Sequence, residues 1–231
     1  MDLSAIFHAL LSTQTPALPD IALLRMARYL SWAIVLAGIA MCMGRGWPQW
    51  LQRGLAGLLF VWTLIPGPAS PAFWLGLAFQ MPSLTSTVIG LVSLVLVLRT
   101  GSCSLSDPAQ MRALQWAGLG GVLLGWLLLL DTFALLPLSL YSLGFSPATL
   151  GALALLASLP WIFFGPHHPA RGVSILLGTV LSLHVLLRLP TGNVWDAMLD
   201  PWLWIALQMG WLFLGVRRVN ALLRQSKATR V

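Results

Sequence analysis

The sequence predicts an all-α, polytopic integral membrane bundle of about seven transmembrane helices. Of its 231 residues, 58% are hydrophobic and only 8% are charged, whereas a soluble domain carries about 25% charged residues. A chain so poor in charge cannot cover a water-facing surface. Two further observations support the prediction: apolar segments of near-spanning length recur along the chain, and the basic residues are unevenly shared among the loops between them.

Seven apolar segments approach the length of about 20 residues that a spanning helix needs. They cover residues 21–44, 51–65, 83–98, 109–135, 147–165, 172–189 and 201–216. Four of them follow a residue typical of a helix N-cap, namely Asp20, Asp107, Ser146 and Asp200, and the last three are each followed by proline. A capping acceptor and a proline in the first turn both favour a helix start. An alternative reading, with residues 54–80 as one kinked helix, leaves the topology unchanged.

The basic residues predict the orientation, because cytoplasmic loops of membrane proteins are enriched in Arg and Lys. With the C-terminus inside, the cytoplasmic side receives Arg45, Arg53, Arg99, Arg112, Arg171, Arg217, Arg218, Arg224, Lys227 and Arg230, and the outer side receives Arg25, Arg28 and Arg188. The N-terminus is then outside. We therefore expect an outer tail at residues 1–20, a transmembrane bundle at 21–216 and a basic cytoplasmic tail at 217–231. Cys42 and Cys103 fall at the inner face, where a reducing cytoplasm would keep them as thiols.

A proline-rich stretch between the second and third apolar segments predicts a short extra helix on the outer side, at about residues 71–80. Ser70 and Pro71 form a helix start, and Met81 precedes Pro82, which disfavours helical geometry. Ten residues rise only about 15 Å, too little to span a membrane. We expect a lid or re-entrant element that carries Trp74, Phe79 and Gln80.

Small residues recur every four positions on the fourth predicted helix and indicate close helix packing. They are Ala113, Ala117, Gly121 and Gly125. Packing within the bundle is the simpler interpretation. The Gly121/Gly125 ridge also leaves open a homo-oligomer or a partner membrane subunit.

Apart from Arg53 and Arg112 at the inner ends of their spans, the charged residues and the histidine inside the predicted spans lie toward the outer side. They are Arg25, Arg28, Asp131, His184 and Arg188. Because charge is costly in hydrocarbon, such residues are functional candidates. We predict an outer-half ligand-binding pocket in which Asp131 pairs with one of the arginines and His184 forms the floor, suited to an anionic headgroup, a quinone carbonyl or a small solute. The alternative is structural: the arginines anchor at the headgroups, Asp131 caps a helix and His184 bonds a carbonyl.

Recognisable catalytic motifs are absent from the sequence. His184 has no second histidine at a similar depth to complete a haem site, and the loop histidines His167 and His168 have no nearby cysteine or carboxylate, so we predict no cofactor and no metal. The scattered basic residues do not indicate nucleic acid. The function expected first is a non-catalytic subunit, scaffold or assembly component of an envelope complex in a bacterial inner membrane. The alternatives are a small transporter or a lipid- or quinone-binding protein and, third, an enzyme acting at the outer face.

Overall fold

The structure, a computed structural model, describes residues 18–44, 46–101, 107–165 and 168–228, and this part of the chain is helical without any strand. Its helices are α2 (Ile21–Met43), α3 (Gln49–Leu64), α4 (Pro71–Phe79), α5 (Leu84–Thr100), α6 (Pro108–Thr132), α7 (Leu140–Leu143), α8 (Pro147–Phe164), α9 (Arg171–Leu187), α10 (Val194–Met198) and α11 (Pro201–Ala228). The all-α prediction is confirmed.

Each of the seven predicted helices is present, as α2, α3, α5, α6, α8, α9 and α11, and the predicted caps form. The carboxylates of Asp20 and Asp107 accept hydrogen bonds from Leu23 N and Ala109 N, both at 2.9 Å. Two ends differ from the prediction by three residues or more: α6 stops at Thr132, and α11 continues to Ala228. The extra helix is also present, as α4.

Two of the described helices, Ile21–Met43 and Pro108–Thr132, are long and apolar enough to cross a membrane. The helices Leu84–Thr100 and Arg171–Leu187 and the segment Pro147–Phe163 are apolar but shorter. Length and composition are weak support for membrane association, and the structure does not confirm a bundle of seven spans.

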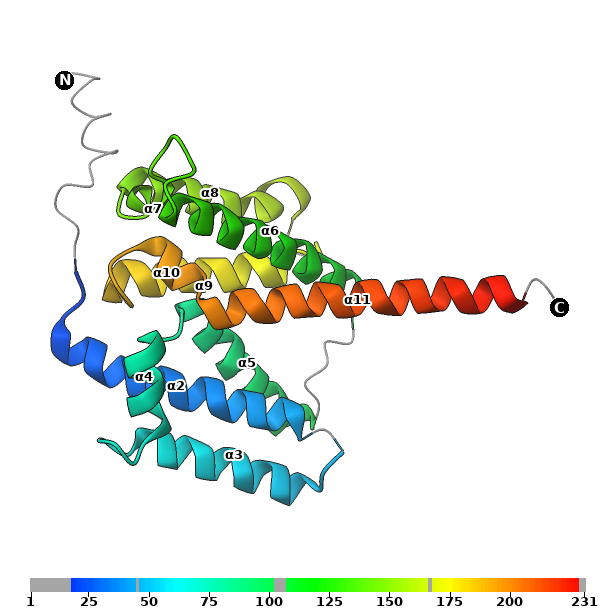
Figure 1. Ribbon diagram of the computed structural model, residues 1–231, viewed down its shortest axis with the longest axis horizontal. Helices are drawn as coiled ribbons and strands as arrows, with labels where there is room; N and C mark the ends of the chain where they lie inside the picture. Colours follow the sequence, from blue (N-terminus) through cyan, green and yellow to red (C-terminus); the bar gives the residue numbers. More distant parts are fainter. Residues whose placement is uncertain (1–17, 45, 102–106, 166–167, 229–231) are drawn as a thin grey trace.

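The longer helices lie side by side, and α4 crosses α2 at one end of the bundle (Figure 1). We call this end the cap end; it consists of residues 65–83, 133–146 and 188–200. The termini of the long helices and the short α4, α7 and α10 meet there. α11 extends past the other helices at the opposite end (Figure 1).

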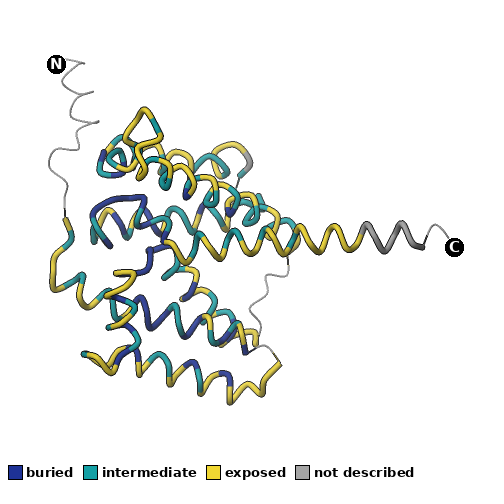
Figure 2. The backbone as a smooth tube through the Cα atoms, in the orientation of Figure 1, coloured by how far each residue is buried: buried dark blue, intermediate teal, exposed yellow. Residues whose placement is uncertain are grey.

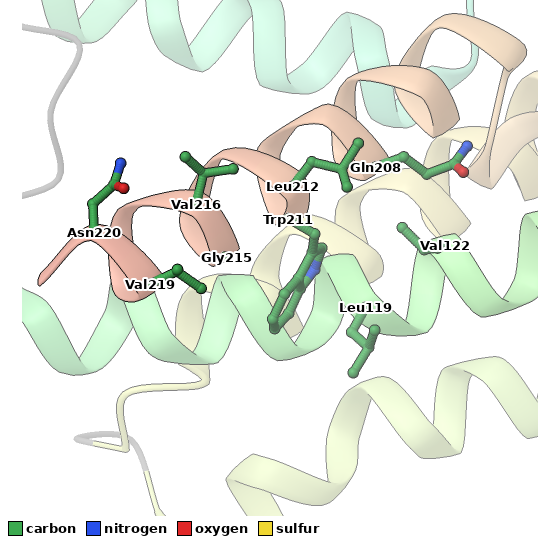
Figure 3. Close-up of a pocket in the computed structure, with 9 residues that line it drawn as sticks. All are labelled: Leu119, Val122, Gln208, Trp211, Leu212, Gly215, Val216, Val219 and Asn220. Atoms are coloured by element: carbon green, nitrogen blue, oxygen red, sulfur yellow. The ribbon is translucent and has the colours of Figure 1, made fainter. Parts of the chain in front are cut away.

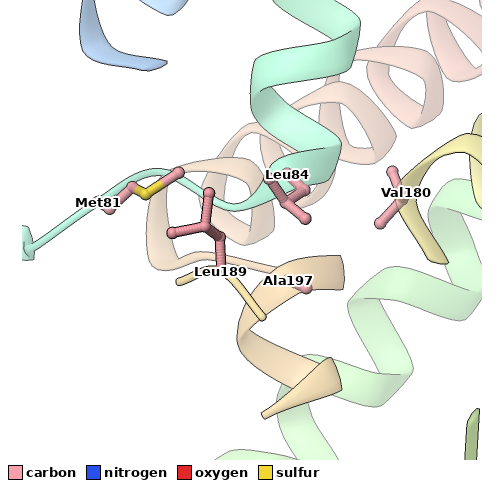
Figure 4. Close-up of a cluster of buried hydrophobic side chains, with 5 residues drawn as sticks. All are labelled: Met81, Leu84, Val180, Leu189 and Ala197. Carbon is pink, nitrogen blue, oxygen red and sulfur yellow. The ribbon is translucent and has the colours of Figure 1, made fainter. Parts of the chain in front are cut away.

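Buried residues concentrate in α2 and at the cap end, as the dark blue segments of Figure 2 show. One apolar cluster joins Met81 and Leu84, at the entry to α5, with Val180, Leu189 and Ala197 (Figure 4). A carboxylate lies beside it: Asp200 Oδ2 accepts hydrogen bonds from Ser83 N at 2.9 Å and Ser83 Oγ at 2.7 Å. The starts of α5 and α11 are thereby tied together.

The predicted small-residue ridge of α6 faces α11 of the same chain for part of its length. A Cβ added to Gly125 would lie 2.3 Å from the Trp204 ring, and one added to Gly121 would lie 2.9 Å from Leu207. Trp204 Nε1 also donates to the Val122 carbonyl at 3.1 Å. Ala113 is half-buried and Ala117 is exposed. Whether any part of this ridge meets another subunit stays a prediction.

Cys42, near the end of α2, is disulfide-bonded. This contradicts the expectation of a thiol at that position. The other cysteine of the sequence, Cys103, lies outside the described residues. The ends of α2 and α5 and the start of α3 meet at this side of the bundle, where Arg53 donates to the Leu98 carbonyl at 3.5 Å.

Candidate ligand site at the cap end

A cavity of about 340 Å³ opens between the start of α2, the middle and end of α4, and the loop after α9. It is lined by Ile21, Leu24, Arg25, Arg28, Gly76, Gln80, Met81 and Pro190. Two arginines and one glutamine therefore line the cavity among otherwise apolar residues and a glycine. This composition suits an anion with an apolar body better than it suits a cation.

Arg28 is the most constrained of the polar lining residues. Its side chain lies directly on Gly76 of α4, where an added Cβ would be 2.8 Å from Arg28 Cδ and 3.1 Å from Nε. Arg28 Nε is buried and has no hydrogen-bond partner among the residues that the structure describes. A buried donor without a partner carries a desolvation cost, which an anion in the cavity would offset.

The three predicted lid residues have different roles. Gln80 lines the cavity; it ends α4 with φ of 60°, and its carbonyl accepts from Trp32 Nε1 at 2.9 Å. Phe79 packs edge-on against Trp202 of α11, with ring centroids 4.8 Å apart. Trp74 donates to the Pro68 carbonyl at 2.8 Å and is 61% exposed. α4 thus borders the cavity through Gly76 and Gln80, and its aromatic rings point elsewhere.

Of the remaining predicted arginines, Arg25 lines the cavity and Arg188 does not. Arg25 is exposed, so its guanidinium is free to reorient toward a ligand. Arg188 ends α9 in a left-handed conformation, with φ of 56°, and its backbone N–H donates to the His184 carbonyl at 2.7 Å. Arg188 is therefore part of the cap end but does not line the cavity.

Asp131 pairs with none of the described arginines. Its Oδ2 accepts from the backbone N–H of Tyr141 at 2.7 Å, and the Tyr141 hydroxyl donates to Asp196 Oδ2, also at 2.7 Å. The prediction of an Asp–Arg pair placed Asp131 inside a longer helix. Because α6 ends at Thr132, the chain turns there and brings Tyr141 to the carboxylate instead. Burial, and then the hydrogen bond from its hydroxyl to Asp196, raise the pKa of Tyr141.

His184 is fully buried behind the cavity. Its Nδ1 is 3.0 Å from the Leu189 carbonyl, and its Nε2 has no partner among the described residues. Pro190, the residue after Leu189, lines the cavity, but His184 does not. The predicted set of five is therefore split: Arg25 and Arg28 share the cavity, His184 and Arg188 support the loop beside it, and Asp131 lies in a separate network.

Sequence reasoning missed the apolar half of the lining, Ile21, Leu24, Met81 and Pro190, because nothing distinguishes these residues from other core or lipid-facing positions. It also missed the double role of Asp200, which caps α11 through Leu203 N at 2.8 Å and binds Ser83 and Ser86 through its other oxygen. The Ser83 cap of α5 was a readable signal, but its carboxylate partner is 117 residues away.

The fold and this cavity define an all-helical bundle with a small cationic cavity at one end. Comparison with protein-family models, with curated proteins and with solved structures finds no match for this chain. In the part of the chain that the structure describes, no three His, Cys, Asp or Glu residues gather in a way that could hold a metal ion.

Proposed function

We propose that the chain is an integral membrane protein of the bacterial inner membrane with seven spans, an outer N-terminus and a cytoplasmic C-terminus. Large apolar side chains exposed in mid-helix support this: Leu58 of α3, Leu123 of α6, Leu156 of α8 and Phe213 of α11 are each 57% exposed or more. Large apolar side chains exposed on four different helices favour contact with lipid or with another protein. The bias of basic residues toward one side supports the orientation.

Within that setting, the function that the geometry supports best is non-catalytic binding of an anionic group in the cap-end cavity. The observation that carries it is Arg28, whose Nε is buried beside Gly76 without a partner among the described residues. Arg25 supplies a second guanidinium at the same cavity. A phosphate or carboxylate accepts from both, since planar guanidinium donors match the oxygens of these anions. The group belongs either to a lipid headgroup or to a small solute.

A thermal-shift experiment tests this function. The full chain is purified in a neutral detergent, and its unfolding is followed by tryptophan fluorescence as inorganic phosphate or a short-chain soluble phosphatidylglycerol is added, at matched ionic strength. A ligand that binds only the folded state raises the unfolding temperature with concentration. We expect this rise in the wild type and its loss in Arg28→Gln.

The matched control is Arg171→Gln, which removes one exposed arginine at the start of α9, away from the cavity. It should keep the full rise. Phosphatidylglycerol acting at lower concentration than phosphate assigns the site to a headgroup, and the reverse order assigns it to a free anion. Equal rises in the unfolding temperatures of Arg28→Gln and Arg171→Gln on addition of a probe would show that the cavity binds neither probe.

A scaffold or subunit role is a second candidate, and α11 favours it. This helix has 28 residues, about 42 Å at 1.5 Å per residue, which exceeds the hydrocarbon thickness of about 30 Å. Its last turns extend beyond the other helices (Figure 1). Such a projection offers a contact for a partner. Co-purification from native membranes tests this role, with the full chain and with a chain ending after Arg218. A partner that is lost with the truncation supports the scaffold role. Isolation of both forms without any partner refutes it.

A further inference from the structure

A second cavity, of about 660 Å³, follows the side of α11 along α6, on the half of these helices farther from the cap end. Its lining is apolar apart from Gln208 and Asn220, which are its first and last residues on α11. Figure 3 shows Trp211 lying between the two helices, with Leu119 and Val122 on the α6 side. We call this cavity the α6–α11 groove.

The two helices run antiparallel, and their contacts fix which residues lie at the same level. Trp204 packs on Gly125, Leu207 packs on Gly121, and the rings of Trp211 and Trp116 are 6.4 Å apart. As the residue number on α11 rises, the residue number at the same level on α6 therefore falls by a similar amount. Continued past Trp211, this pairing brings Arg218 level with Arg112.

Arg112 and Arg218 also lie on the faces that border the groove. Residues seven apart lie two turns apart on nearly the same face of a helix. Arg112 is seven residues before Leu119, and Arg218 is seven residues after Trp211, and both of these partners line the groove. Both arginines are exposed, and neither has a hydrogen bond or ion pair with any described residue. The end of the groove farther from the cap end, which we call its mouth, therefore has one unpaired arginine on each helix.

Two other described charged groups of this region, Arg217 and Asp107, have contacts of their own. Arg217 lies over the ring of Phe213, with 5.0 Å between its Cζ and the ring centroid. Asp107 uses its Oδ1 to accept from Ala109 N at 2.9 Å and caps α6. The mouth of the groove therefore carries a net positive charge that the described residues do not neutralise.

We propose that the α6–α11 groove binds an anionic glycerophospholipid of the bilayer, with one acyl chain along the groove and the phosphate between Arg112 and Arg218. From Gln208 to Asn220 the groove follows α11 for about 18 Å at 1.5 Å per residue, which is close to one leaflet of a hydrocarbon core about 30 Å thick. Basic side chains at this depth attract anionic lipids. This site rests on the proposed membrane insertion but not on the cap-end cavity.

Native mass spectrometry of the full chain in detergent tests the site, with phosphatidylglycerol and phosphatidylcholine of identical acyl chains as probes. We expect the first bound lipid to be phosphatidylglycerol, with at least about tenfold preference. Arg112→Gln and Arg218→Gln should each weaken phosphatidylglycerol binding about fivefold and leave phosphatidylcholine binding unchanged. Arg217→Gln removes the same charge from the same turn of α11 and should change neither.

Two glycines of α11 give a matched pair for the acyl chain. Among the described residues, no heavy atom lies within 4 Å of a Cβ added to Gly210 or to Gly215, so an added Cβ meets no clash at either position, but only Gly215 lines the groove. Gly215→Phe should reduce the binding of both lipids at least tenfold, and Gly210→Phe should leave it intact.

Equal binding of the two lipids, equal effects of Arg217→Gln and Arg218→Gln, or retained binding in Gly215→Phe would overturn the lipid site. The lipid site would also be overturned if the wild type had the mass of a dimer and Gly215→Phe the mass of a monomer, because the groove would then hold a second copy of the chain. Extraction of membranes with alkaline carbonate separates this result from the proposed membrane insertion. A chain that carbonate removes is not integral, whereas a chain that stays in the pellet without phosphatidylglycerol preference lacks only the lipid site.

Discussion

Gly38 of α2 and Gly90 of α5 bring two helix backbones into direct contact. A Cβ added to Gly38 would lie 3.0 Å from the Gly90 carbonyl oxygen and 3.1 Å from its Cα, and one added to Gly90 would lie 3.3 Å from the Ile34 carbonyl oxygen. Backbone atoms cannot turn aside as a long side chain can. The distance between α2 and α5 therefore depends on the absence of a side chain at both positions.

We expect Gly38→Ala and Gly90→Ala each to destabilise the fold by about 1–3 kcal/mol, because an extra methyl group must push the helices apart. Gly178→Ala is the matched control: this α9 position has open space around an added Cβ. Alanine there should be neutral or slightly stabilising, since it favours the helix by up to about 1 kcal/mol. Thermal unfolding in detergent compares the three variants, and equal unfolding temperatures would show that the contact is not tight.

Asp200→Asn should destabilise the cap end. The carboxylate is 8% exposed and accepts hydrogen bonds from Ser83 N, Ser83 Oγ, Ser86 Oγ and Leu203 N. An amide can accept through only one of its two atoms, so at least one donor loses its partner, at a cost of about 1–3 kcal/mol. Asp107→Asn is the control, because asparagine caps an exposed helix start as well as aspartate does. Chemical unfolding that shifts equally in the two variants would contradict the network.

Tyr141 predicts a loss of stability at alkaline pH. Its pKa is raised above the ordinary tyrosine value of about 10 by burial and by the hydrogen bond to Asp196. In the unfolded chain the phenol ionises near pH 10, while in the folded chain it stays neutral to higher pH. The stabilisation is therefore complete below about pH 10 and declines as the pH rises from there toward the folded pKa. Unfolding temperatures at pH 8 to 12 should fall more steeply in the wild type than in Tyr141→Phe; parallel curves would contradict the shift.

The orientation of the chain is open to a direct test at the end of the bundle opposite the cap end. The basic residues assign this end to the cytoplasm, while the disulfide at Cys42 is of the kind that persists in oxidising compartments. Reporter proteins fused after Val231 distinguish a cytoplasmic from an outer location of this end. We expect a fluorescent protein to be bright and alkaline phosphatase to be inactive, because the charge bias extends over every loop. An active phosphatase fusion would reverse the proposed topology and agree with the disulfide.

Helix positions were predictable from this sequence because local signals define them. Asp20, Asp107, Ser146 and Asp200 cap the helices that they were expected to cap, and the helix begun at Ser70 ends at Phe79, as the downstream proline indicated. α7 and α10 were missed, since each is a single turn held by distant partners. Asn193, for example, reaches the Tyr141 carbonyl 52 residues away.

The candidate site was predictable only in part, for the same reason. Helical spacing places Arg25 and Arg28 on one face, and the structure brings both to the cavity. The predicted partner of these arginines was wrong, because three residues of misplaced helix end at Thr132 redirect Asp131 to Tyr141. Spacing along one helix can be read from a sequence, but the side chain that another helix contributes cannot.

The unequal lengths of the helices have a consequence for the surrounding lipid. α3 has 16 residues and α5 has 17, which correspond to about 24 and 26 Å, whereas α2 and α6, with 23 and 25 residues, reach about 35 and 38 Å. In the proposed bilayer setting, the hydrophobic mismatch differs around the circumference: the membrane thins beside α3, and α6 tilts to fit it. Bilayers of shorter acyl chains should reduce the thinning needed beside α3 and increase the tilt of α6. The protein should therefore be most stable in bilayers of intermediate thickness.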